Sequence, residues 1–229
     1  SEKYYCMSVI EFDGYVNFAQ NTNSKLVFGL SMGYPLYPQS NTMWNYSNTQ
    51  QFLRHLHYVR HYNSSHIYGF ELGNEVSNDD PYNNAIYQSN AFRELRGIID
   101  GIWGSDNNIK LFGPDPHSYI LTDGDTFNYF VDFVRESCTI MDGITYHSYV
   151  NENKSQLLTV DGLNEQYLHS LKVSNIWNDP SITEQSENCA DLVHRIWAGE
   201  IAEHDAKGAP SGLLNTYYDG FWFLDALGT

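Results

Sequence analysis

Basic residues are scarce in this sequence, with 12 Lys and Arg against 28 Asp and Glu and a formal charge of −16. A chain with this much negative charge repels polyanions at long range. It also contains no basic run and no nucleic-acid-binding motif. We therefore expect no nucleic-acid partner. It also contains no signal peptide and no apolar run of membrane-spanning length. The three cysteines, Cys6, Cys138 and Cys189, lack metal-ligand spacing and allow at most one disulfide.

Three sequons are present, at Asn45, Asn63 and Asn153. They permit N-glycosylation if the chain is secreted, although sequons also arise by chance in a sequence rich in Asn and Ser. The first residue is not Met, so an upstream segment removed during maturation is compatible with the sequence.

Short apolar runs alternate with segments of helical periodicity along the chain. The predicted strands are Lys25–Leu30, Ile67–Leu72, Ile109–Phe112, Gly143–Tyr146 and Arg195–Gly199. The predicted helices are Ser47–Tyr62, Ala91–Trp103, Asp125–Glu136, Leu163–Trp177 and Gly212–Leu227. This alternation predicts an α/β fold with a parallel sheet, which both a doubly wound sheet and a (β/α)8 TIM-type barrel would satisfy.

Two features favour the barrel over the doubly wound sheet. The glycine-rich phosphate loop expected after the first strand of a doubly wound nucleotide-binding sheet is absent. Glu75 and Glu200 each follow a predicted strand, at the strand end where barrels place their catalytic groups. Since only five of the eight barrel strands are recognised, residues 1–229 are predicted to be one partial catalytic barrel, either a fragment or one chain of a processed enzyme.

A pair of strand-end glutamates on one rim is typical of retaining glycosidases, in which one acts as acid/base and the other as nucleophile. The alternative is that Glu75 and Glu200 are ordinary surface residues. The aromatic content of 15% suits a hydrophobic core, and it also suits flat platforms for sugar rings.

Five segments, in order and with compatible spacing, resemble the heparanase family, glycoside hydrolase family 79. They are residues 26–30 (Leu-Val-Phe-Gly-Leu), 70–75 (Phe-Glu-Leu-Gly-Asn-Glu), 110–115 (Lys-Leu-Phe-Gly-Pro-Asp), 145–149 (Thr-Tyr-His-Ser-Tyr) and 197–200 (Trp-Ala-Gly-Glu). The last is followed by Gly-Ala-Pro at 208–210 and Gly-Phe-Trp-Phe-Leu-Asp at 220–225. The resemblance runs from about Ser24 to the C-terminus, and it also includes a first helix that precedes Ser24.

The resemblance implies a retaining endo-β-glucuronidase that acts on an extracellular glycan, heparan sulfate or a less sulfated relative. It implies a secreted, extracellular, lysosomal or membrane-associated glycoprotein that needs no cofactor and no metal. The five predicted strands would be barrel strands 3 to 7, and a second chain could supply missing ones.

The resemblance also assigns roles to single residues. Glu75 would be the acid/base and Glu200 the nucleophile, while Asn74 would bind the 2-hydroxyl of the sugar. Tyr149 would hold Glu200, and His147 would line the sugar site. Asn74 could instead be a turn residue and His147 a satisfied core histidine.

The sequence departs from the family pattern in three places. Val76 follows the acid/base motif where Pro is usual, and residues 116–125 contain no Lys or Arg to grip a sulfated chain. Asp205-Ala206-Lys207-Gly208 replaces a glycine-rich loop that binds a uronate carboxylate, so Lys207 and Gly208 are the predicted contacts there. Two alternatives therefore stay open: a pseudoenzyme that binds glycans or proteins without turnover, and a clan-related β-glycosidase acting on neutral sugars.

Overall fold

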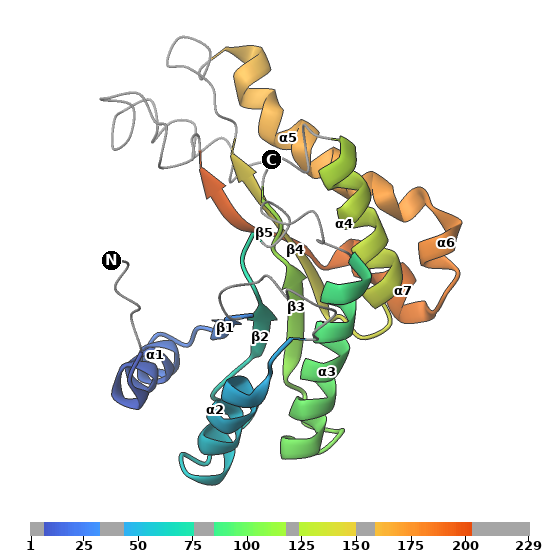
Figure 1. The fold of residues 1–229 in the computed structure, drawn as a ribbon. Helices are drawn as coiled ribbons and strands as arrows, with labels where there is room; N and C mark the ends of the chain where they lie inside the picture. Colours follow the sequence, from blue (N-terminus) through green and yellow to red (C-terminus); the bar gives the residue numbers. More distant parts are fainter. Residues whose placement is uncertain (1–6, 33–43, 76–84, 118–123, 150–158, 203–229) are drawn as a thin grey trace, which may run out of the picture. The chain divides into compact units, whose positions relative to one another are not determined.

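The computed structural model describes residues 7–32, 44–75, 85–117, 124–149 and 159–202 (Figure 1). Its strands are β1 (Val27–Leu30), β2 (Gly69–Leu72), β3 (Lys110–Pro114), β4 (Gly143–Tyr149) and β5 (Ile196–Ala202). Its helices are α1 (Val9–Asn21), α2 (Ser47–Tyr58), α3 (Ala85–Trp103), α4 (Gly124–Ser137), α5 (Val160–Ser174), α6 (Pro180–Thr183) and α7 (Glu187–Asp191), with 3-10 turns η3 (Asn175–Asn178) and η4 (Leu192–His194). Within these ranges, no helix is both long enough and apolar enough to span a membrane. The predicted helix at 212–227 lies outside the described residues.

The five strands form a sheet in the order β1-β2-β3-β4-β5. The pairs β1–β2, β2–β3 and β4–β5 are all parallel. A doubly wound sheet reverses its strand order at a switch point, whereas consecutive barrel strands lie in chain order. The observed order therefore fits the predicted partial barrel and not the doubly wound alternative.

Helix α1 is absent from the helices predicted by periodicity, because its apolar residues do not gather on one face. Phe12 and Val16 are fully buried, whereas Ile10 is 82% exposed. Its beginning nevertheless carries a local signal. Ser8 and Glu11 form a capping box, in which the Ser8 hydroxyl accepts from the Glu11 amide and the Glu11 carboxylate accepts from the Ser8 amide.

The chain divides into two compact units, residues 1–73 with 90–112 and residues 74–89 with 113–229. In the first unit the Phe12 ring meets the rings of Phe28 and Phe52 edge-on, at centroid distances of 5.0 and 5.2 Å. Strands β2 and β3 approach closely at Gly69, where an added Cβ would lie 2.7 Å from the Lys110 carbonyl oxygen. Glycine is therefore required there for packing between strands.

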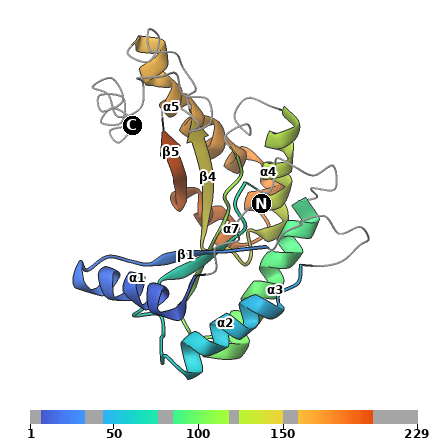
Figure 2. The ribbon, with the colours of Figure 1, turned by 60° about the vertical axis from the view of Figure 1, so that its left-hand side comes forward.

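In the second unit, β4 is buried along nearly its whole length, from Gly143 to Ser148. Figure 2 shows α5 running beside it. The Ser148 hydroxyl lies 2.8 Å from His169 Nδ1, and the Tyr146 hydroxyl lies 3.0 Å from the Ser170 hydroxyl. These polar contacts satisfy buried groups of β4 and fix the strand against the helix.

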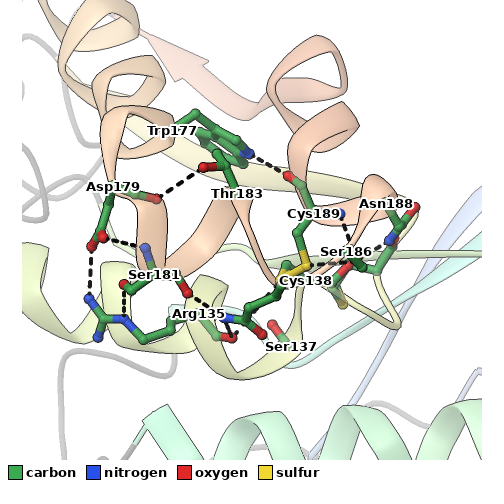
Figure 3. Close-up of a disulfide and its surroundings, with 12 residues drawn as sticks. Arg135, Ser137, Cys138, Trp177, Asp179, Ser181, Thr183, Ser186, Asn188 and Cys189 are labelled. Carbon is green, nitrogen blue, oxygen red and sulfur yellow. Dashed lines mark hydrogen bonds and ion pairs between the residues drawn. A yellow bond between two sulfur atoms is a disulfide. The ribbon is translucent and has the colours of Figure 1, made fainter.

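One disulfide joins Cys138, directly after α4, to Cys189 in α7 (Figure 3). Around it, the Asn188 side chain donates to the carbonyl oxygens of Cys138 and Met141 at 2.6 and 3.0 Å, and the Trp177 indole donates to the Cys189 carbonyl at 2.9 Å. A cross-link over 51 residues constrains the unfolded chain by about 4 kcal/mol in the chain-entropy model. The pairing agrees with the expectation of at most one disulfide.

Candidate active site

Glu75 lies three residues beyond β2, in a turn with unusual backbone angles. Gly73 has φ +81° and Glu75 has φ +52°, a left-handed conformation that few non-glycine residues adopt. The Glu75 amide is held at 2.9 Å from the carbonyl oxygen of Asp115, which follows β3. This hydrogen bond anchors the turn to the segment that follows β3. The Glu75 side chain is 29% exposed.

Glu200 does not follow its strand as predicted from the sequence but lies within it, because β5 continues to Ala202. The predicted strand ended at Gly199. In the structure Gly199 is instead an extra residue in the pairing: Tyr146 is opposite Ala198, and the next pair is His147 with Glu200. This bulge brings the Glu200 side chain to the same face as His147, whereas uninterrupted pairing would have turned it away.

His147 lies between the two glutamates and is fully buried. Its Nδ1 atom is 2.9 Å from Glu75 Oε1 and 3.7 Å from Glu200 Oε2. Tyr149 projects from the same side of β4 two residues later, and its hydroxyl donates a hydrogen bond to Glu200 Oε2. One strand therefore contacts both carboxylates, which approach each other to within 4.8 Å.

Asp115 completes the group, although it was not among the residues predicted from the sequence to form the site. Its carboxylate is buried, and Oδ1 lies 3.0 Å from His147 Nε2. Neither of these two atoms has a well-directed hydrogen bond, so we interpret the contact as an ion pair. The signal that points to Asp115 is its place directly after β3, at the same kind of strand end that pointed to Glu75.

His117 is a second site residue that was not predicted from the sequence. It is buried, and its Nε2 atom lies 3.9 Å from Glu75 Oε1. Its ring lies 6.4 Å from that of Tyr149. Two residues separate it from the strand end, so neither strand periodicity nor a motif marked it.

Charges around His147 decide its protonation. Burial by itself would lower the pKa of His147, but the neighbouring carboxylates of Asp115, Glu75 and Glu200 outweigh this and raise the pKa to about 9. His147 is therefore an imidazolium at neutral pH, with N–H donors on both ring nitrogens. A positive charge thus lies among three acidic side chains.

Of the residues predicted to form the site, the structure brings together Glu75, Glu200, His147 and Tyr149. Asn74 is exposed in the turn before Glu75. Lys207 and Gly208 lie outside the described residues. Chemically, the arrangement offers two carboxylates with oxygens within 4.8 Å of each other, a cationic hydrogen-bond donor between them and a phenol that donates to one of them.

Glu75, His147 and Glu200 also present three atoms of the kind that ligate metals, all within 4.8 Å of one another. His147 Nδ1 already makes a hydrogen bond to Glu75. Carboxylates and a histidine used for proton transfer have the same composition as a metal site, so this grouping alone does not call for an ion.

Comparison with known proteins identifies the family of this chain and one of its relatives. Residues 3–228 match the N-terminal domain of glycosyl hydrolase family 79, which is a (β/α)8 barrel, so the predicted family resemblance and fold class are confirmed. Heparanase from Gallus gallus is 29% identical over 230 residues, which cover 92% of this chain. The chain spans 38% of the length of that relative.

Proposed function

Because the chain belongs to glycosyl hydrolase family 79, we propose that it carries the catalytic groups of a retaining glycoside hydrolase that cleaves β-glucuronidic linkages. The observation that supports this best is the approach of Glu75 and Glu200 oxygens to within 4.8 Å. Retaining glycosidases hold their carboxyl groups about 5–5.5 Å apart, and inverting ones hold them roughly 6.5–9.5 Å apart to admit a water. The short separation favours the retaining reaction.

In the proposed reaction, Glu200 attacks the anomeric carbon while Glu75 gives its proton to the glycosidic oxygen. The bond to the leaving sugar breaks, and a covalent glycosyl-enzyme forms on Glu200. Glu75 then removes a proton from water, and the resulting oxygen nucleophile displaces Glu200 from the anomeric carbon. The enzyme regains its initial protonation state.

His147 and Tyr149 support the nucleophile in this scheme. The nucleophile attacks as a carboxylate, and the imidazolium and the phenol hydroxyl both lie next to Glu200. The Tyr149 hydrogen bond holds Glu200 Oε2, and His147 Nδ1 lies 3.7 Å from the same oxygen, so the other oxygen is the one proposed to face the sugar. Asn74, at the exposed end of the turn, is proposed to bind the 2-hydroxyl.

The proposed substrate is heparan sulfate or a less sulfated polysaccharide related to it, since the relative found is a heparanase. Lys207 and Gly208 are proposed to meet the uronate carboxylate, and Asp205 in the same segment would oppose it. The charge of −16 and the lack of Lys and Arg in residues 116–125 favour the less sulfated substrate.

We also propose a secreted, extracellular or lysosomal location. The Cys138–Cys189 disulfide suits an oxidising compartment. Asn45 and Asn63, the two sequon asparagines among the described residues, are both exposed. A second chain that supplies further barrel strands remains part of the proposal.

A mechanism-based glucuronide probe, which traps the glycosyl-enzyme, tests the function on the complete protein that contains this chain. The label, mapped by peptide mass spectrometry, is expected on Glu200 and should be lost in Glu200→Gln. Glu94→Gln, at an exposed position of α3, serves as the matched control. Label from a neutral-sugar probe alone would overturn the glucuronide assignment, and no label from either probe on folded protein would favour a pseudoenzyme.

A further inference from the structure

Asp115 touches three separate parts of the candidate active site. Its backbone carbonyl accepts the hydrogen bond from the Glu75 amide, and its carboxylate forms the ion pair with His147. The same carboxylate lies against β5 at Gly199, the residue before Glu200. Like His147, Asp115 therefore contacts both the proposed acid/base and the strand that carries the nucleophile.

The backbone of Asp115 is adapted to this place. It has φ +55°, a left-handed conformation that Asp tolerates better than most residues. The next residue, Pro116, accepts a hydrogen bond from the His147 amide at 3.2 Å. The segment after β3 is therefore attached both to the Glu75 turn and to β4, which fixes the direction of the Asp115 carboxylate.

Gly199 makes room for that carboxylate. A Cβ added at Gly199 would overlap Asp115 Oδ1 and would lie 3.3 Å from Asp115 Cγ. Glycine at the bulge thus serves a second purpose besides the change of register. It lets an acidic group lie directly beside the backbone of the strand that carries Glu200.

The chemistry of this cluster depends on how many protons it holds. Three carboxylates, those of Glu75, Asp115 and Glu200, surround one buried imidazole, while Tyr149 and His117 are the other ionisable groups nearby. A nucleophile must be unprotonated and an acid must carry a proton. The 2.9 Å hydrogen bond between His147 Nδ1 and Glu75 Oε1 lets one proton belong to either atom.

We propose that Asp115 is a positioning residue that keeps this proton on the His147–Glu75 pair, so that the general acid of the site is the pair and not Glu75 alone. The proposal rests on the proposed function, because it concerns the proton that reaches the leaving oxygen. In the first half-reaction this shared proton passes from Nδ1 through Glu75 to the glycosidic oxygen, which leaves His147 neutral and Glu75 as a carboxylate. In the second half-reaction the proton that Glu75 takes from water restores the pair.

The direction of the effect follows from charge. The negative Asp115 side chain stabilises the protonated pair, and the raised pKa of His147 agrees with this. Replacing Asp115 by Asn preserves shape and removes the charge. The pair should then lose its proton at lower pH. The turnover rate should fall most for substrates whose leaving group must be protonated as the bond breaks.

Asp115→Asn in the complete protein tests the proposal, with Asp106→Asn at an exposed loop position as the control. The alkaline limb of the kcat/KM profile on an aryl β-glucuronide is expected to move about one unit or more toward lower pH. Turnover of the polysaccharide should fall at least about tenfold more than turnover of an aryl glucuronide with an acidic phenol, because the latter needs little protonation. An unshifted limb with equal losses on both substrates would assign Asp115 a purely structural role and overturn the proposal.

Two further measurements keep the outcome clear. Gly199→Ala, which forces the Asp115 carboxylate away, is expected to shift the same limb in the same direction. The 15N resonances of the His147 ring should show an imidazolium to above pH 8 in the parent protein and titration at lower pH in Asp115→Asn. A parent protein without turnover or probe label would refute the proposed function, whereas an unchanged His147 titration would refute the role of Asp115 independently of activity.

Discussion

The Tyr149 hydroxyl donates a hydrogen bond to Glu200 across the β4–β5 pair. Tyr149 is opposite Ala202 in the register, so Glu200 is its diagonal neighbour, two residues earlier on the same face. A long aromatic side chain spans this diagonal, while the shorter histidine two residues before it is directly opposite Glu200. The nucleophile is thereby held from two points on one strand.

Loss of this hydrogen bond should slow the first chemical step. For Tyr149→Phe we expect labelling of Glu200 by the glucuronide probe to slow about 10- to 100-fold, the range for a hydrogen bond to a charged group. The phenyl ring stays in place, so the free energy of unfolding should change little. Tyr167→Phe, at a position 49% exposed on α5, is the control. Equal labelling rates in the two variants would show that the Tyr149 hydroxyl does not orient the nucleophile.

Two glycine substitutions should change stability in opposite directions. An alanine at Gly69 would place Cβ 2.7 Å from both the Lys110 carbonyl oxygen and Phe112 Cε2, so we expect it to lower the free energy of unfolding. The expected loss is about 1–3 kcal/mol, as for other overpacked sites. Gly97→Ala lies in α3 with nothing within 4 Å of the new Cβ, and it should gain roughly 0.5–1 kcal/mol. Urea denaturation measures both, and a stabilising Gly69→Ala would contradict the close approach of β2 and β3.

The disulfide should contribute to stability without contributing to chemistry. Replacing Cys138 and Cys189 together by Ser should lower the free energy of unfolding by about 2–4 kcal/mol, because the unfolded chain gains freedom. Cys6→Ser leaves the cross-link intact and serves as the control. Urea denaturation curves measure the free energy of unfolding of each variant. Intact mass under non-reducing conditions verifies whether the disulfide is present. Matching curves for the double variant and the control would mean that the cross-link adds nothing.

His169 should make the protein less stable in acid. Burial, together with the charge of Lys172, lowers the pKa of His169 to about 4. In the unfolded chain the residue gains a proton near pH 6.5, but in the folded protein it does so only near pH 4, so protonation between these values favours unfolding. We expect stability to fall by roughly 1–3 kcal/mol over this interval through this residue.

The matching variants are His169→Gln, which can still hydrogen-bond to Ser148, and His194→Gln, which replaces an exposed histidine. Stability measured from pH 7 to pH 4 should decline less steeply in His169→Gln than in the parent protein, and His194→Gln should follow the parent. If His169→Gln declined as steeply, the buried neutral histidine would not be the cause.

The sequence predicted the barrel class and placed Glu75 and Glu200 on one rim, because strand ends in a parallel sheet meet on one side. The family resemblance added His147 and Tyr149 to them. Asp115 was harder to recognise, since its role depends on contacts with the Glu75 turn, β4 and β5 at once. The bulge at Gly199 was harder still to predict from the sequence. A glycine in an apolar run ends a strand as readily as it interrupts one, and only the pairing with β4 distinguishes the two.

The extra residue at Gly199 divides β5 into two segments whose alternation is set independently. Ile196 to Ala198 follow the pairing with Ile144 to Tyr146, and the segment from Glu200 onward follows a register of its own. Repacking the first segment therefore leaves the orientation of the nucleophile unchanged. Deleting one residue at the junction would reverse that orientation without altering a single side chain of the site, so chain length at this point is as much a determinant of the chemistry as residue identity.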